Sequence, residues 1–207
     1  MVSEPRRVVL ATGNAGKLRE FRSLLGDLVI LVPQSELSID PVEETGASFE
    51  ENALLKARHA AAISGLAAIA DDSGLVVDAL GGAPGVRSAR YAGEAGDDEA
   101  NNVKLLRALD GVPADRRGAR FRAVVVYVAS ADDQSPLIAQ GTWEGFIGMG
   151  LRGANGFGYD PLFLDGDSER TSAELPPDEK NRLSHRGQAV RKLRIMLDKR
   201  VDHPDSG

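Results

Sequence analysis

Residues 7–26, RVVLATGNAGKLREFRSLLG, contain the pattern that decides the fold. Residues 7–11 are a short, largely apolar run typical of a buried strand, and residues 12–17 form a glycine-containing turn. Residues 18–26 have the apolar spacing of an amphipathic helix, which Gly26 is placed to end. A strand that leads through a turn into a helix indicates an α/β protein.

The rest of the chain continues the alternation of strands and helices. The apolar pattern predicts helices at 48–65 and 96–111, and a loop with a long C-terminal helix within 172–200. Strands are expected at 28–32, 66–70, 75–80, 119–130 and 136–148, with a glycine-rich loop and a short strand at 153–163. Because the chain has no linker or repeat, residues 1–207 are expected to form a single domain, with a frayed tail at 201–207.

Composition excludes several kinds of site. With no cysteine among the 207 residues, disulfides, thiolate zinc sites and a cysteine nucleophile are excluded, and three histidines argue against a histidine-rich metal site. Any metal is therefore expected to be a hard cation held by oxygen ligands. The net charge of −6 argues against nucleic-acid and membrane-surface partners. No apolar run is long enough for a membrane span or a signal peptide, so we expect a cytoplasmic protein.

Acidic residues gather in two segments. ADDSG (70–74) follows the strand predicted at 66–70 and supplies Asp71 and Asp72, and VEETG (42–46) supplies Glu43 and Glu44. Carboxylates from separate loops suit Mg²⁺, which prefers oxygen ligands and completes its shell with water and substrate phosphates. The alternative interpretation is that these acids are only solvated charges in loops.

Basic residues and helix N-termini suggest anion binding. TGNAGK (12–17) joins a strand to a helix, where free N–H groups attract phosphate and Lys17 would add a point charge. The segment lacks the glycine spacing and final residues of a Walker A loop, and an ordinary turn is the alternative. Asn52 and Lys56 share one face of the helix predicted at 48–65.

Two later segments could recognise a nucleotide base. In GFGYDP (156–161), Phe157 or Tyr159 could stack on a base, whereas the alternative is a bulge that packs Phe157 into the core. Lys180, His185 and Arg186 lie in EKNRLSHRG (179–187). A basic donor there would favour a keto purine over adenine, because an unpaired buried donor costs ~1–3 kcal/mol. The alternative is a charged helix start.

These segments, taken together and in order, resemble the inosine triphosphate pyrophosphatase family, most closely its bacterial dITP/XTP pyrophosphatases. The motifs are TGNAGK, EETGASFEENALLKA, ADDSGL, LGGAPGVRSARYAG, GFGYDP and EKNRLSHRG, and they extend over roughly residues 7–198. The resemblance implies an elongated mixed central sheet with helices on both faces, two lobes with a substrate cleft between them, and a homodimer. It also implies Mg²⁺-dependent hydrolysis of dITP, ITP and XTP between the α- and β-phosphates, which removes deaminated purines from the nucleotide pool.

The same resemblance implies roles for single residues. Asp72 would be the catalytic proton acceptor and a metal ligand, and Glu43 the second metal-linked carboxylate, although Glu44 stands beside it. The implied substrate-binding residues are Thr12, Gly13, Asn14, Ala15, Gly16, Lys17, Lys56, Ser73, Phe157, Gly158, Tyr159, Asp160, Lys180, His185 and Arg186. This chain departs from the family before the base loop, where Arg152 is expected to replace a basic residue.

Two rival functions stay open at the level of sequence. One is a related pyrophosphatase that acts on modified pyrimidine triphosphates. The other is a non-catalytic module that senses purine triphosphates, against which the set of carboxylates argues, because binding alone needs fewer metal ligands.

Overall fold

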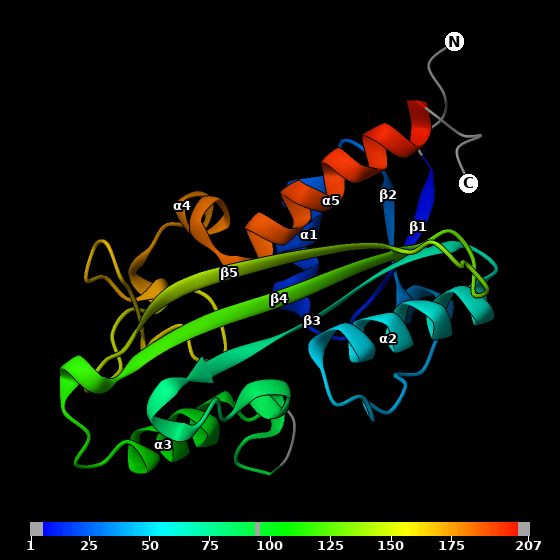
Figure 1. Cartoon of the computed structure of the whole chain (residues 1–207). Helices are drawn as coiled ribbons and strands as arrows, with labels where there is room; N and C mark the ends of the chain where they lie inside the picture. Colours follow the sequence, from blue (N-terminus) through cyan, green and yellow to red (C-terminus); the bar gives the residue numbers. More distant parts are fainter. Residues whose placement is uncertain (1–5, 94–95, 203–207) are drawn as a thin grey trace. The chain divides into compact units, whose positions relative to one another are not determined.

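The structure is a computed structural model that describes residues 6–93 and 96–202. Within these residues the chain forms a mixed sheet of six strands in the order β2-β1-β3-β4-β5-β6, accompanied by helices (Figure 1). The strands are β1 (Arg7–Ala11), β2 (Ile30–Pro33), β3 (Ala67–Val77), β4 (Gly118–Val128), β5 (Leu137–Ile147) and β6 (Phe163–Asp165). Strand β1 pairs in parallel with β2 and β3, and β5 pairs antiparallel with β6. The α/β prediction is therefore confirmed.

The α-helices are α1 (Ala15–Leu25), α2 (Phe49–Ser64), α3 (Asp98–Ala108), α4 (Pro177–Leu183) and α5 (His185–Asp202). Two predictions about them were wrong. Helix α1 begins at Ala15, inside the segment expected to be a turn, and the C-terminal segment forms two helices that Ser184 separates. Helix α5 continues to Asp202, beyond the start of the expected frayed tail, and residues 203–207 lie outside the described residues.

The chain divides into two compact units. Of the described residues, the first unit comprises 6–72, 123–140 and 186–202, and the second comprises 73–93, 96–122 and 141–185. Strands β3, β4 and β5 contribute residues to both units.

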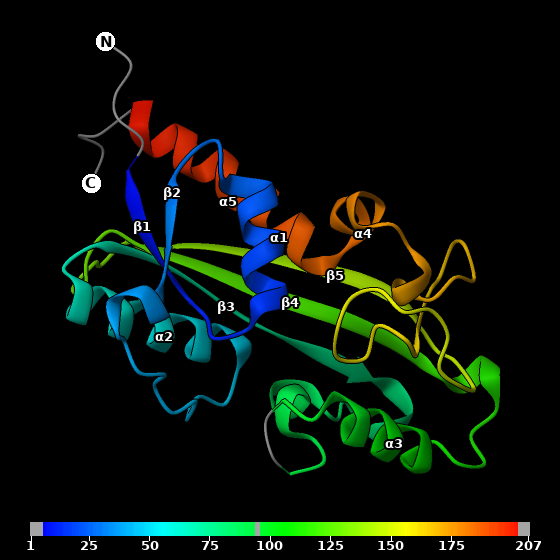
Figure 2. The ribbon, with the colours of Figure 1, turned by 180° about the vertical axis from the view of Figure 1, so that it is seen from behind.

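In the first unit, helices cover both faces of the sheet (Figures 1 and 2). Side chains alternate between the faces of a strand, so Val8 and Leu10 of β1 point to the face that α1 and α5 cover. There they join a core that includes Phe21 of α1 and Leu193 of α5. Helix α2 packs against β1 and buries a row of small side chains, namely Ala53, Ala57, Ala60 and Ala61.

The second unit has its own core around aromatic side chains. The ring of Phe163 lies 4.6 Å from that of Phe121 and 5.1 Å from that of Trp143, measured between centroids. Leu105 of α3 and Leu109, which caps the end of that helix, complete this core together with Leu75, Val77, Ala119, Ile147, Tyr159, Leu162 and Leu175. Buried Trp143 also donates to Asp165 (Nε1 to Oδ1, 3.0 Å), so its polar group has a partner.

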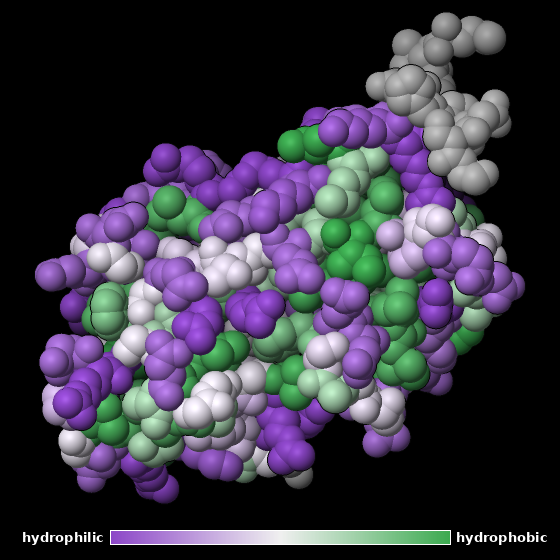
Figure 3. All heavy atoms as spheres, viewed as in Figure 1, coloured by the Kyte–Doolittle hydropathy of each residue, from purple (hydrophilic) through white to green (hydrophobic). Residues whose placement is uncertain are grey.

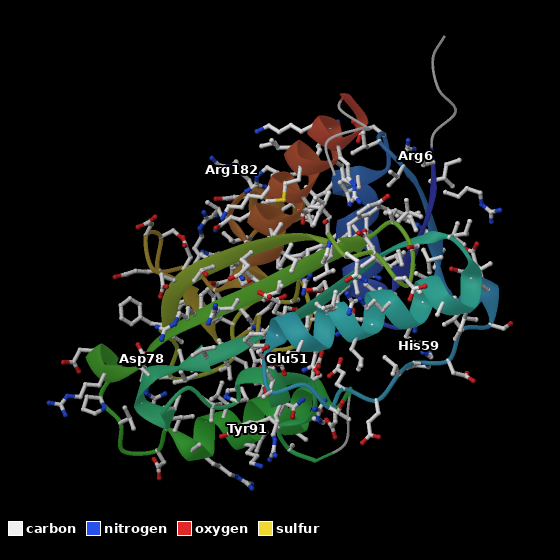
Figure 4. All side chains as sticks on the ribbon, turned by 45° about the vertical axis from the view of Figure 1, so that its right-hand side comes forward. Arg6, Glu51, His59, Asp78, Tyr91 and Arg182 are labelled. Atoms are coloured by element: carbon white, nitrogen blue, oxygen red, sulfur yellow. The ribbon has the colours of Figure 1, made fainter. Side chains whose placement is uncertain are left out.

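Helix α2 begins and ends where the sequence predicts. Ser48 accepts a hydrogen bond from the backbone N–H of Glu51, and the Glu51 carboxylate reaches back to the N–H of Ala47 at 2.7 Å. Gly65 ends the helix with φ of 67°, a left-handed conformation that glycine adopts readily. Figure 4 labels Glu51 and His59 on this helix, and the ring of His59 lies 2.9 Å from the carbonyl oxygen of Asp40 in the preceding loop.

Hydrophilic side chains cover much of the face drawn in Figure 3, with smaller apolar areas between them. Among the described residues, no helix combines the length and the hydropathy that a membrane crossing requires.

Candidate functional site

Asp71 and Asp72 lie inside one continuous strand, β3, and not in a turn between two strands. The prediction of separate strands at 66–70 and 75–80 was therefore wrong. Successive side chains of a strand point to opposite faces, so the two carboxylates are directed to opposite sides of the sheet. Asp71 contacts side chains of α1 and α5, whereas Asp72 contacts side chains of α2. The two acids thus have different ion-pair partners within the first unit, although the charge of Lys56 also acts on Lys17 and Asp71.

Asp71 is the centre of a buried ion-pair network. Its Oδ1 lies 2.9 Å from Nζ of Lys17 and 3.2 Å from Nε of Arg186, whose guanidinium also donates to Glu20 at 2.5 Å. Burial acts to raise the pKa of Asp71, but the charges of Arg186 and Lys17 outweigh it and hold the pKa below its ordinary value. Burial lowers the pKa of Lys17, and the charge of Asp71 offsets only part of that effect. Asp71 is therefore ionised and held in place.

Asp72 belongs to a second cluster, built around the ammonium group of Lys56. Nζ of Lys56 lies 2.8 Å from Asp72 Oδ1 and 2.9 Å from Glu44 Oε1, and Asn52 donates to the other oxygen of Asp72 at 3.3 Å. Burial raises the pKa of Asp72, and the Lys56 charge offsets this only in part. Burial acts to lower the pKa of Lys56, yet two carboxylates share its charge and raise it. Lys56 therefore stays protonated, and the pKa of Asp72 lies above its ordinary value.

Gly46 allows the acidic loop to approach α2. Its N–H donates to Oδ1 of Asn52 at 2.8 Å, and a Cβ added at Gly46 would lie 2.6 Å from that oxygen. Asn52 is completely buried and so fixes the end of the loop that carries Glu44. This contact explains why Glu44 reaches Lys56.

The structure brings Glu44, and not Glu43, to the Asp72 cluster. Glu43 is exposed, whereas Glu44 is half-buried beside Lys56. Among residues 6–93 and 96–202, no group of three or more His, Asp or Glu side chains is arranged to hold a metal ion. Two carboxylates around one positive charge nevertheless provide the oxygen donors that Mg²⁺ prefers when phosphate and water complete its shell. The residues present therefore fit a hard cation that is bound together with substrate.

The TGNAGK segment forms the N-terminus of α1. Asn14 is the N-cap and accepts from the N–H of Lys17 at 3.0 Å, while Thr12 Oγ1 accepts from the N–H of Asn14 at 3.1 Å. Gly13, Asn14 and Ala15 are exposed, and Gly16 is buried. Because Lys17 lies in the first turn of the helix, its side chain reaches Asp71 on β3. Triphosphate binding by this segment stays a prediction.

In the second unit, Asp160 connects the implied base loop to α4. Its Oδ2 accepts from the N–H of Phe157 at 2.8 Å and from Nζ of Lys180 at 2.6 Å, and its Oδ1 accepts from Ser172 at 2.9 Å. Asp160 and Lys180 are both buried. The Lys180 ammonium lies 5.0 Å from the centroid of the Phe157 ring, which is within the range of a cation–π contact.

The two aromatic rings of the base loop have different environments. Tyr159 is buried in the second core and donates its hydroxyl to the carbonyl oxygen of Ser88 at 2.8 Å. Phe157 is only half-buried and does not belong to that core. Of the two rings that could stack on a base, Phe157 is therefore the more accessible one.

The remaining predicted residues have separate surroundings. His185 is buried in the second unit with its ring stacked on Phe121 at 4.7 Å, whereas the next residue, Arg186, belongs to the Asp71 network of the first unit. Ser73 is half-buried in β3. Arg152, expected to replace a basic residue of the family, binds the Glu174 carboxylate at 2.7 Å. Base recognition by Lys180, His185 and Arg186 stays a prediction.

A family model of known proteins matches most of the chain. Residues 8–196 match the Ham1 family along almost the whole chain. The chain belongs to the Ham1 family. The resemblance found in the sequence motifs is thereby confirmed.

Similar proteins of known sequence cover the Ham1-family chain almost completely. A dITP/XTP pyrophosphatase from Methylococcus capsulatus is 62% identical over 193 residues, which are 93% of this chain and 96% of that protein. A dITP/XTP pyrophosphatase from Escherichia coli O157:H7 is 55% identical over 194 residues, which are 93% of this chain and 97% of that protein.

Solved structures agree with the fold of this Ham1-family chain. A HAM1 protein from Coxiella burnetii superposes with a TM-score of 0.86 at 48% identity, covering 94% of this chain and 99% of that one. A nucleoside-triphosphatase, or dITP/XTP pyrophosphatase, from Mycobacterium abscessus has a TM-score of 0.73 at 45% identity, covering 90% and 98%.

Sequence reasoning missed several residues that the structure brings to the clusters of this Ham1 protein. Glu20 lies three positions after Lys17 in α1, a helical spacing that was a usable signal. Asp98 and Asn102 of α3 bind the base loop, but they are far from it in the sequence, so no local pattern pointed to them.

Proposed function

We propose that this protein is a nucleoside triphosphate pyrophosphohydrolase that converts dITP, ITP and XTP into the monophosphate and pyrophosphate. The names of its relatives from M. capsulatus and E. coli support this proposal. The structural observation that carries it is the cluster in which Glu44 and Asp72 share the ammonium of Lys56. The neighbouring residue of the strand, Asp71, binds Lys17. Carboxylates and lysines so arranged suit a triphosphate with its cation.

Asp72 is the group that we assign to proton transfer. A water oxygen forms a bond to the α-phosphorus, the bond from that phosphorus to the bridging oxygen breaks, and the water proton passes to a carboxylate oxygen of Asp72. Its pKa, raised by burial, moves it toward the range of an effective proton acceptor. Asn52 donates to one oxygen of Asp72 and helps to fix its direction.

The lysines are assigned to the leaving group. Pyrophosphate gains negative charge as the bond breaks, and the ammonium groups of Lys17 and Lys56 would stabilise that charge. Asp72 and Glu44 would hold Mg²⁺ with oxygens of the substrate, and the ion when bound would neutralise phosphate charge and acidify water. Since Lys56 contacts both carboxylates here, its ammonium would move toward the phosphates when the cation binds.

Base selection is assigned to the second unit. The half-buried ring of Phe157 provides a stacking surface, and Lys180 is a donor held by Asp160. A donor that meets the carbonyl oxygen of hypoxanthine or xanthine loses that partner with adenine, which costs ~1–3 kcal/mol. This difference would let the protein act on deaminated purines and spare ATP. We further propose that it does so as a homodimer in the cytoplasm, without nucleic-acid or membrane partners.

A screen for pyrophosphate release tests the proposal. The purified chain is incubated with Mg²⁺ and either dITP, ITP, XTP, ATP, GTP, dUTP or dTTP, and pyrophosphate and monophosphate are quantified. The proposal predicts release from the first three in clear preference to ATP. Preference for the pyrimidines would favour the pyrimidine pyrophosphatase, and tight binding without release would favour a sensing module. Light scattering after size exclusion tests the dimer.

A further inference from the structure

Helix α3 holds both backbone polar groups of Gly158 in the implied base loop. The N–H of Gly158 donates to Asp98 Oδ2 at 2.7 Å, and Asn102 Nδ2 donates to the carbonyl oxygen of Gly158 at 2.9 Å. Asp98 and Asn102 are spaced i, i+4, so they lie on the same face of α3, one turn apart. Two side chains of one helix therefore grip a single residue of the loop.

The second contact comes at an energetic cost. Asn102 is 5% exposed, and its Oδ1 is buried without a hydrogen-bond partner. A buried acceptor left unsatisfied costs about 1–3 kcal/mol, which a leucine of similar size would avoid. Turning the amide over would place its oxygen against the carbonyl of Gly158, so the side chain donates as described. Asn102 lowers the stability of the fold and uses its N–H donor to bind a loop, so it is a candidate for a functional role.

The contacts of Asp98 and Asn102 with Gly158 also hold the preceding residue, Phe157. The N–H of Phe157 is bound to Asp160 and the N–H of Gly158 to Asp98, so the peptide groups on both sides of the Phe157 side chain are held. Gly158 has φ of 63°, and a Cβ there would meet no atom within 4 Å. The glycine is therefore required for its left-handed backbone and not for space.

The occupied groups also limit how the loop can recognise a base. The N–H and C=O of Gly158 cannot read the edge of a purine unless they exchange a protein partner for it. What the loop presents is then the ring of Phe157, covered by the ammonium of Lys180. Stacking on a ring that is already fixed loses less conformational entropy than stacking on a mobile one.

We propose that Asp98 and Asn102 are positioning residues that hold Phe157 for base stacking and thereby set the affinity for the purine. This inference rests on the proposed function. Loss of either contact releases Phe157 without touching the Asp72 cluster, which belongs to the other unit. The KM for dITP should therefore rise while kcat changes little.

Four variants of the full chain test the role. Asn102→Leu removes the donor, and Asp98→Ala removes the exposed acceptor with little risk to folding. Since one hydrogen bond contributes about 0.5–1.5 kcal/mol, each should raise the KM for dITP about 2- to 12-fold, with kcat within about 2-fold of wild type. Asp98→Asn keeps an acceptor and should restore the KM. Calorimetric titration with IMP should show the same loss of affinity without any turnover.

Asn101→Leu is the matched control. Asn101 is also buried in α3, but it binds the N–H of Ala92 and the carbonyl of Ala89 and not the base loop. It should lower the melting temperature and leave the KM for dITP unchanged. A wild-type KM and IMP affinity in both Asn102→Leu and Asp98→Ala, or an equal rise in Asn101→Leu, would overturn the role while the proposed function stands. A wild-type protein that releases no pyrophosphate would overturn both.

Discussion

Asp71 and Asp72 are consecutive residues of β3 whose carboxylates bind different lysines on opposite faces of the sheet, Lys17 on α1 and Lys56 on α2. The two acids of this pair are thus neighbours in the sequence with different ion-pair partners. Asp71 is paired with two basic side chains and its pKa is lowered, whereas Asp72 is next to one lysine and its pKa is raised. The two acids should accordingly respond to mutation in different ways.

Replacing Asp72 by Asn should nearly abolish turnover and preserve the fold. The amide cannot accept the water proton, and loss of a general base typically lowers rates 10²- to 10⁴-fold. Pyrophosphate release from dITP measures the loss, and circular dichroism and the melting temperature measure the fold. Turnover within a few-fold of wild type would refute the assignment.

Replacing Asp71 by Asn should mainly destabilise the protein. Lys17 and Arg186 would keep their charges in a buried network that has lost its central carboxylate. Removal of one partner of a buried ion pair costs about 3–5 kcal/mol. Urea denaturation of the variant and of Asp72→Asn gives the comparison, and equal unfolding free energies in the two variants would contradict the prediction.

Glu44 and Glu43 should differ in their effect on the requirement for Mg²⁺. Glu44→Gln removes a carboxylate next to Asp72 and should raise the Mg²⁺ concentration for half-maximal activity by about 10-fold or more. Glu43→Gln changes an exposed side chain and serves as the control, with an expected curve close to wild type. A Mg²⁺ titration of dITP hydrolysis decides between them, and the reverse order of effects would restore Glu43 as the ligand.

Two glycines of the base loop should tolerate alanine unequally. A Cβ at Gly156 would lie 2.0 Å from Oδ2 of Asp160, the oxygen that holds Phe157 and Lys180. Gly156→Ala should therefore lower stability and raise the KM for dITP by about 10-fold or more, since it displaces a buried charge pair. Gly158→Ala meets only the left-handed backbone cost of about 1–2 kcal/mol. A larger effect at Gly158 on melting temperature and KM would contradict this order.

Lowering the pH should remove the contribution that the Glu174 carboxylate makes to the stability of the second unit. Hydrogen bonds from Arg152 and from the N–H of Thr171 lower the pKa of Glu174 from 4.5 to about 2. A carboxylate with a lowered pKa contributes stability above its unfolded pKa and loses it as the pH falls toward the folded value. Because Glu174 is exposed to solvent screening, the effect should be modest.

Melting temperatures at several pH values test that contribution. The melting temperature of the wild type should exceed that of Glu174→Gln near pH 6, and the difference should shrink below pH 4.5 and disappear below about pH 2. A difference that does not change with pH would show that the charge of Glu174 is not involved.

The sequence was sufficient for the class of fold and for most strands and helices. Apolar periodicity located β1, α2, β4 and β5, and the Ser48 and Glu51 spacing located the start of α2. Periodicity failed at Asp71 and Asp72, because aspartate and glycine are rare in strands and favour a turn. Ion pairs with three basic side chains from other elements allow β3 to continue through them.

The candidate site was predictable only in its motif residues. The choice between Glu43 and Glu44 depends on the close approach of Gly46 to Asn52, which neighbouring sequence does not reveal. The grip of α3 on Gly158 joins residues about sixty positions apart, and such contacts leave no periodic signal. Physical reasoning from sequence thus found the chemical groups more readily than their partners.

The continuity of β3 has one more consequence. This strand lies between β1 and β4, and its pairing with β1 extends to Ala70, the residue immediately before Asp71. Carboxylates attached to such a strand need no loop closure to reach their orientation, and the entropy of fixing them is lost during folding, before any nucleotide arrives. The orientation of the Asp72 carboxylate is therefore set when the sheet forms.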